Sequence, residues 1–160
     1  MALMKIKDSR LLPERADNSY HGHKLALWLF GLLLLMKGAI SVNSMLNGYM
    51  VATSADGIPV DSFSPAGMQA FIALFGLWGY SHLMLCLLGV LVLLRYRNLL
   101  PLMYTMLLVE HLGRKFLLYL HPIEKTGTSH GLTINLVILA LMVIGLALSL
   151  WRPRAGTAGS

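Results

Sequence analysis

The chain has 160 residues, of which 56% are hydrophobic and 12% are charged, about half the charged share of an ordinary globular domain. With a mean hydropathy of +0.67, this composition all but excludes a soluble protein. The net charge is +6, but the basic residues flank apolar runs and form no basic face, which argues against nucleic-acid binding. The single cysteine, Cys86, lies inside an apolar run, so the chain has neither a disulfide framework nor a CxxC motif.

Four apolar runs divide the sequence, each near the roughly 20 residues that cross a hydrocarbon core. They cover residues 25–46, 66–94, 99–120 and 132–151. Inside a bilayer no water satisfies the backbone, and the runs do not alternate as barrel strands do, so they must be helices. The sequence predicts an all-α membrane protein, a four-transmembrane-helix bundle.

Signals at the ends of the runs support this division. Ser64 followed by Pro65 predicts an N-cap and first turn for the second helix, and Asn98 is expected to cap the third. The link between these two helices is so short that they must form an antiparallel hairpin. Residues 50–64 and 121–131 contain Gly and Pro and are predicted loops.

The distribution of basic residues predicts the orientation in the membrane. Nine of them lie before the first run, between the second and third, or after the fourth, whereas the other two loops are mainly acidic. By the positive-inside rule, the arm of residues 1–24 and the tail of residues 152–160 are cytoplasmic and residues 25–151 form the transmembrane domain. We therefore expect a multi-pass protein of the bacterial inner (plasma) membrane. Cleavage of a signal peptide near residues 53–55 is disfavoured, because that segment lies far beyond the first apolar run.

Ionisable side chains inside the predicted spans are candidates for function, because each is costly in lipid. At 1.5 Å per residue, Lys37, His82 and His111 all lie about 20 Å from the cytoplasmic ends of their helices, in one polar layer of the outer half. The candidate ligand-binding or partner-binding residues are Lys37, Ser41, His82, Glu110, His111 and Arg114, with Ser44 on the face of Lys37. The fourth helix offers only Thr133 and Asn135 and is expected to act mainly as an apolar wall.

Small residues of the second helix share one face with His82. These residues are Gly76, Gly79, Cys86 and Gly89, and such small side chains let membrane helices approach closely. We therefore expect this face to pack against a neighbouring helix and to carry His82 into the bundle.

Two interpretations of the polar layer remain open. In a purely structural one, Glu110 pairs with Arg114 along its own helix and with Lys37 from another, which locks the helix register. However, two cations then oppose one carboxylate. The excess charge favours a small ligand such as a quinone or a lipid headgroup, or a carboxylate from a partner subunit. A non-enzymatic accessory or binding protein in the lipid bilayer is thus the first hypothesis, with another membrane subunit or a second copy of the chain as further partners.

The alternative is a membrane redox protein that binds quinone or heme b. His82 and His111 would ligate the heme iron, and Arg114 or Lys37 would meet the propionates. Against heme, the helices of a tight hairpin pack only about 8 to 10 Å apart.

Other chemistry is not predicted. His82 and Cys86 lie four residues apart on one face but supply only two ligands, so no metal site is expected. The sequence contains no nucleophile motif, phosphate-binding loop or pair of carboxylates, so we assign no catalytic residue. A channel or transporter is disfavoured because four helices leave little lumen.

The layout of the chain is similar to that of a known group of membrane proteins. Four helices, a longer outer first loop, and a first helix with Gly31 and the segment Met36-Lys37-Gly38 resemble the DoxX-like small bacterial membrane proteins. The resemblance is architectural and spans residues 25–151. It implies a four-helix bundle often linked to quinone or redox chemistry, and no site residue is carried over from it.

Overall fold

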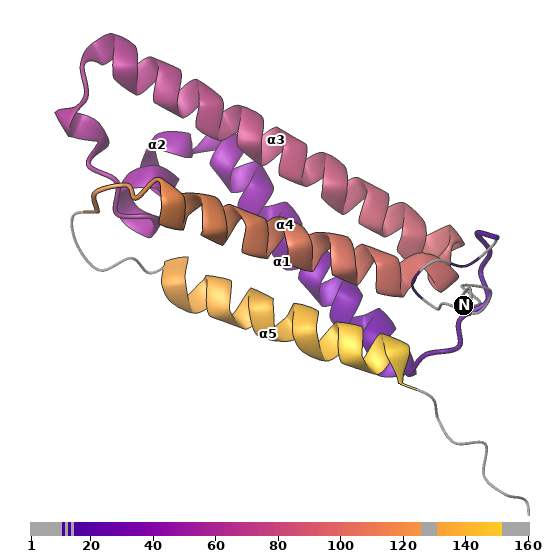
Figure 1. Cartoon of the computed structure of the whole chain (residues 1–160). Helices are drawn as coiled ribbons and strands as arrows, with labels where there is room; N and C mark the ends of the chain where they lie inside the picture. Colours follow the sequence, from indigo (N-terminus) through magenta and orange to yellow (C-terminus); the bar gives the residue numbers. More distant parts are fainter. Residues whose placement is uncertain (1–10, 12, 14, 126–130, 152–160) are drawn as a thin grey trace, which may run out of the picture.

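The computed structural model describes residues 11, 13, 15–125 and 131–151, and this part of the chain contains helices but no strand. The long helices are α1 (Lys24–Leu46), α3 (Pro65–Arg95), α4 (Leu100–Leu120) and α5 (Gly131–Leu150) (Figure 1). Each begins and ends within one residue of the predicted run. The predicted tail of residues 152–160 and most of residues 1–14 lie outside the described residues.

Three of the described helices, α1, α3 and α5, are long and apolar enough to cross a membrane. The chain is thus an all-helical protein of membrane type. Helix α4 has a similar length but carries Glu110, Arg114 and Lys115 within its 21 residues. Its apolar character is weaker for this reason, and the fourth span stays a prediction.

Helix α1 lies at the centre of the bundle and packs against α3 and α5, while α4 packs against α5. A short 3-10 turn, η4 (Arg97–Leu99), joins α3 to α4, and the two run antiparallel as predicted. They lie close together at this turn and diverge toward their other ends (Figure 1). We call the half of the bundle around η4 the turn half and the opposite half the loop half.

The turn half is a closed apolar core centred on Tyr104. The ring of Tyr104 meets Phe30 edge-to-face with centroids 4.9 Å apart, and its hydroxyl donates a hydrogen bond to the Ala26 carbonyl at 2.8 Å. Gly145 of α5 lies directly against the same ring, where a side chain would overlap it. A buried Tyr whose hydroxyl is satisfied packs as a large apolar residue, so this layer joins α1, α4 and α5.

The predicted small-residue face of α3 does pack against α1, with one exception. A Cβ on Gly79 would lie 2.9 Å from the Ser41 carbonyl oxygen, and one on Gly89 would lie 2.6 Å from a Leu34 methyl. Gly76 has no neighbouring atom within 4 Å of such a Cβ. The prediction of close packing is therefore wrong at Gly76, which precedes the part of α3 that faces α1.

The two predicted caps have different outcomes. The Ser64 hydroxyl accepts a hydrogen bond from the Gly67 N–H at 3.2 Å, which confirms the N-cap of α3. Asn98 is not the cap of α4, because it lies inside η4. Its side-chain amide instead donates to the Arg15 carbonyl at 2.6 Å and accepts from the Asp17 N–H at 3.1 Å. Asn98 thereby fastens the N-terminal arm to the α3–α4 turn.

The segment predicted as a loop over residues 50–64 is largely wound into short helical turns. These are the end of α2 (Gly48–Met50), the π-helical turn η2 (Val51–Ala55) and the 3-10 turn η3 (Val60–Ser62). The prediction of an irregular loop is wrong because Ala52, Ile58 and Val60 are buried in a second small core against α3, with Met68 and Phe71 beside them. This segment covers the loop half of the bundle.

Candidate functional site

Glu110 of α4 is the centre of a polar cluster that joins three helices. The ammonium of Lys37, from α1, donates to Glu110 Oε2 at 3.2 Å. The Nδ1 atom of His82, from α3, lies 3.6 Å from Glu110 Oε1. Lys37 and His82 are only 3% and 8% exposed, and pairing offsets the cost of burying a charge. The structure thus brings these residues into one layer, as predicted from their depths.

Helix geometry accounts for the contribution of α1. Lys37, Ser41 and Ser44 follow one another at helical spacing and are all buried on one face. The Ser41 hydroxyl donates to the Lys37 carbonyl at 2.7 Å. The Ser44 hydroxyl is fully buried and has no hydrogen-bond partner in the part of the chain that the structure describes, which is uncommon for a buried polar atom.

Arg114 does not form its predicted ion pair. No carboxylate oxygen of the described residues lies within 4.0 Å of its guanidinium, because Lys37 and His82 occupy the two oxygens of Glu110. The guanidinium donates instead to Asn135 Oδ1 at 3.4 Å and lies 3.5 Å from His111 Nδ1. These are long contacts with neutral groups.

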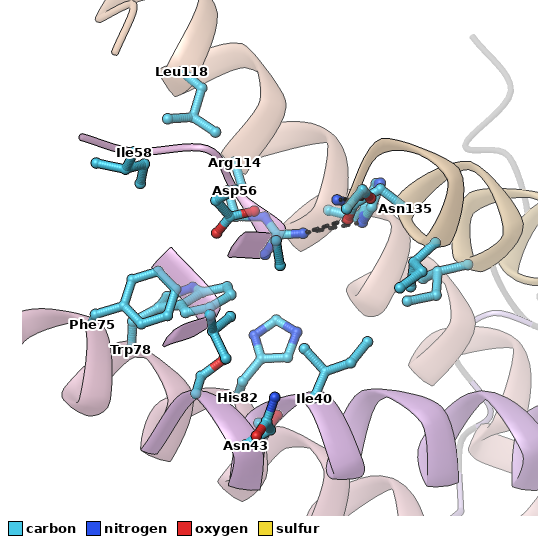
Figure 2. A pocket seen from close by; sticks show the side chains of 18 of the residues that line it. Ile40, Asn43, Asp56, Ile58, Phe75, Trp78, His82, Arg114, Leu118 and Asn135 are labelled. Carbon is cyan, nitrogen blue, oxygen red and sulfur yellow. Dashed lines mark hydrogen bonds between the residues drawn. The ribbon is translucent and has the colours of Figure 1, made fainter. Parts of the chain in front are cut away.

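The position of Arg114 is set by an aromatic ring. Its guanidinium carbon lies 5.0 Å from the centroid of Trp78, which is a cation–π distance. Figure 2 shows Arg114 bonded to Asn135, with Trp78 and His82 on α3. Of the two polar residues expected from α5, Asn135 thus contacts the site, whereas Thr133 is exposed and takes no part.

A cavity of about 430 Å³ lies in the loop half, next to this cluster. All of the predicted candidate residues except Glu110 line it, namely Lys37, Ser41, His82, His111 and Arg114, together with Ser44. Its volume falls in the range of pockets that hold small molecules. The cavity exists because α3 and α4 diverge, so the close hairpin packing that we expected to argue against a bulky ligand applies only near η4.

A row of rings along α3 forms one wall of the cavity and was not anticipated from the sequence. The row begins at Phe63, which lies before α3 and outside the cavity lining. From Phe63 to Phe71, Phe75, Trp78 and His82, the ring centroids are successively 5.6, 5.9, 5.4 and 5.3 Å apart. The signal was present, because the last four lie at spacings of four, three and four residues, which place side chains on one helix face.

Three further charged residues line the cavity near the helical segment that covers it: Asp56, Lys115 and Lys125. Burial raises the pKa of the Asp56 carboxyl above its usual value, and the charges of Lys125, Arg114 and Lys115 act against this rise. Asp56 and Lys125 come from segments predicted as loops. No pattern in the sequence places these two residues at the site, because their position depends on how the two segments fold over the helices.

The site offers mainly hydrogen-bond donors and positive charge to the cavity, on the side chains of Lys37, Ser44, His111 and Arg114. Within the described part of the chain, no three His, Cys, Asp or Glu side chains form a group that could hold a metal ion. Two imidazoles, His82 and His111, line the cavity. No protein-family model, curated protein or solved structure matches this chain.

Proposed function

We propose that this chain is a multi-pass protein of the inner (plasma) membrane, with both termini cytoplasmic, that binds a small ligand in the cavity of its loop half. In this proposal it is a binding or accessory protein with no catalytic residue of its own. The polar layer holds the polar part of the ligand, and the aromatic wall packs against its apolar part.

The distribution of side chains on α4 supports a fourth membrane span. Glu110 is turned inward to Lys37, whereas Val109, Leu112 and Phe116 are exposed. An apolar outer face and a paired inner charge are what a membrane-spanning helix requires. The basic residues beside η4 and before α1 then lie in the cytoplasm.

The observation that carries the proposal is Arg114, which has no carboxylate oxygen within 4.0 Å among the described residues, together with the buried hydroxyl of Ser44. A polar layer that only locked helix register would account for the contact between Lys37 and Glu110. Within the part of the chain that the structure describes, it would not account for an arginine with no carboxylate oxygen within 4.0 Å, or for a Ser44 hydroxyl with no hydrogen bond, in residues that line one cavity. Buried polar groups are normally satisfied, so a ligand that satisfies both is the simplest explanation.

Native mass spectrometry and solvent extraction of the protein purified in mild detergent test this function. We expect a co-purifying small molecule with the wild type and its loss in Ile40→Trp, because half-buried Ile40 lines the cavity. Ile144→Trp is the matched control, since Ile144 is exposed on α5. An equal yield of the molecule from both variants would place it outside the cavity. Recovery of a larger complex with an empty cavity would favour a partner subunit instead.

A redox protein is the second candidate, favoured by the line of groups from Lys37 through Glu110 to His82. Such a line can carry a proton to or from a quinone in the cavity, and the DoxX-like resemblance implies quinone chemistry. Heme b at His82 and His111 belongs to the same candidate. Extracted quinone, or a Soret band after expression with heme, favours this function; a colourless, quinone-free protein rejects it.

A further inference from the structure

We propose that the ligand of the cavity is an amphipathic molecule with an oxyanion head, a carboxylate or a phosphate, and that Arg114 binds this head. The inference rests on the proposed function and specifies the chemical class of its ligand. Three independent features carry it: the balance of charge, the free donors around Arg114, and the apolar walls.

The charges around the cavity do not cancel. Four cations line it, Lys37, Arg114, Lys115 and Lys125. Among the described residues in or next to the lining, two carboxylates, Glu110 and Asp56, oppose them, with Glu110 in direct contact with Lys37. Counting the histidines as neutral, the group carries an excess of two positive charges. The excess comes from Lys115 and Lys125, which are exposed, and such a positive surface at a cavity raises the local concentration of negatively charged ligands.

Arg114 has the geometry to bind an oxyanion. A guanidinium carries five N–H groups in a plane, and among the described residues Arg114 makes two long contacts, to Asn135 and His111. The cation–π contact with Trp78, at 5.0 Å from the guanidinium carbon to the ring centroid, holds the group at this position. A fixed guanidinium with free N–H groups binds carboxylate or phosphate with two parallel hydrogen bonds.

Two neutral donors reinforce this preference. Arg114 can donate only to a lone pair on His111 Nδ1, and this assignment puts the imidazole proton on Nε2. Ser44 also lines the cavity, and its buried hydroxyl has no hydrogen-bond partner among the described residues. An oxyanion, which only accepts hydrogen bonds, matches these groups better than an ammonium or a neutral alcohol does.

The remaining walls require an apolar body. Phe71, Phe75 and Trp78 line one side, and Ile40 and Ile138 line others. A free phosphate or other small hydrophilic anion would leave these apolar surfaces without an apolar contact. The class is therefore an acyl or similar apolar chain that ends in an oxyanion, which is found both in a free fatty acid and in phosphatidic acid.

Quenching of Trp78 fluorescence measures binding at this site. The other two tryptophans, Trp28 and Trp151, are exposed, and Trp28→Phe with Trp151→Phe leaves Trp78 as the sole reporter. The full chain in nanodiscs of neutral lipid is titrated with three probes of equal chain length. These are a brominated fatty acid, its methyl ester, and phosphatidic acid with brominated chains.

We expect saturable quenching by the fatty acid, by phosphatidic acid, or by both, and at least about tenfold weaker quenching by the ester. In this background, Arg114→Gln should weaken binding of the acidic probe about tenfold or more, since a charge-assisted hydrogen-bond pair is lost. Arg95→Gln, the same change at the exposed far end of α3, should leave it unchanged. Asp56→Asn should tighten it a few-fold, which a misfolded protein could not do.

The outcomes separate the inference from the proposed function. Quenching by the fatty acid alone identifies a free acid as the ligand class, and quenching by phosphatidic acid alone identifies a lipid phosphate. Equal quenching by acid and ester, or an Arg114→Gln protein that binds as the wild type does, overturns the oxyanion head but leaves a ligand-binding cavity. If no probe quenches Trp78 and Ile40→Trp still yields the native co-purifying molecule, both proposals fail.

Discussion

The two halves of the bundle use the same four helices in opposite ways. In the turn half, Tyr104 fills the space between α1, α4 and α5, and its hydroxyl is bonded to a backbone carbonyl. In the loop half, α3 and α4 stand apart around a cavity of about 430 Å³ lined by charged groups. The difference shows that a tight apolar core at one end can hold helices together while the other end keeps an open cavity.

The link between the halves is α1, whose single buried face changes character along its length. Toward the turn half it presents Ala26, Phe30 and Leu33, and toward the loop half it presents Lys37 and Ser41. Large apolar side chains pack closely and leave little empty volume, whereas paired polar groups require particular partners at particular distances. Apolar packing and the polar layer thus belong to separate segments of one helix.

The largest effect is expected where the polar layer also holds helices together. Glu110→Leu leaves the buried Lys37 without its partner, and breaking a buried pair typically costs about 3 to 5 kcal/mol. We expect the lower end, because the Glu110 side chain is 26% exposed. Thermal unfolding in detergent measures the loss, with Glu124→Leu at an exposed position as the control. A wild-type midpoint for the Glu110 variant would show that the loop half needs no internal charge pair.

A smaller loss is expected from overpacking the turn half. Gly145→Ala places a methyl group on the Tyr104 ring, and the ring is held by Phe30 and by its hydrogen bond, so about 1 to 3 kcal/mol is lost. Gly76→Ala is the matched control in α3, where nothing lies within 4 Å; it should be neutral or slightly stabilising. Thermal unfolding in detergent compares the two variants, and equal unfolding midpoints would contradict the tight packing described for Tyr104.

Removing one hydroxyl tests the turn half more finely. Tyr104→Phe deletes the hydrogen bond to the Ala26 carbonyl and should cost about 1 kcal/mol. Ligand binding should not change, because the hydroxyl is in the other half. Tyr119→Phe serves as the control, since Tyr119 is 81% exposed. Weaker binding in Tyr104→Phe would show that the two halves are coupled.

The smallest effect concerns pH and Asp56. Burial raises the pKa of its carboxyl, so the folded chain holds this proton at pH values where the unfolded chain has lost it. Lowering the pH through the raised pKa neutralises Asp56 and should strengthen anion binding a few-fold. By the same linkage, the stability contributed by this group is present below the unfolded-state pKa and is lost as pH rises through the folded-state pKa.

An always-ionised probe isolates this effect. A brominated alkyl sulfonate keeps its charge between about pH 8 and about pH 5, so any change in its quenching of Trp78 reports on the protein. In the Asp56→Asn variant, quenching of Trp78 by this probe should change less with pH. An unchanged pH dependence in that variant would assign the titration to another group.

The sequence by itself determined the helices and the residues of the polar layer. Runs of about 20 apolar residues need helices in a membrane, and helical spacing put Lys37, Ser41 and Ser44 on one face. Equal distances from the helix ends placed His82 and His111 at the depth of Lys37. These predictions depend only on the regular rise and period of a helix.

The tertiary structure decided which of those groups pair and what surrounds them. Spacing alone allowed Glu110 to pair with Arg114, but Lys37 and His82 take its oxygens, and Arg114 turns to Trp78 and Asn135. The divergence of α3 and α4, which makes the cavity, follows from the packing of whole helices and leaves no mark in local sequence. Helical periodicity is a local property, whereas partner choice and empty space are set by residues distant in the chain.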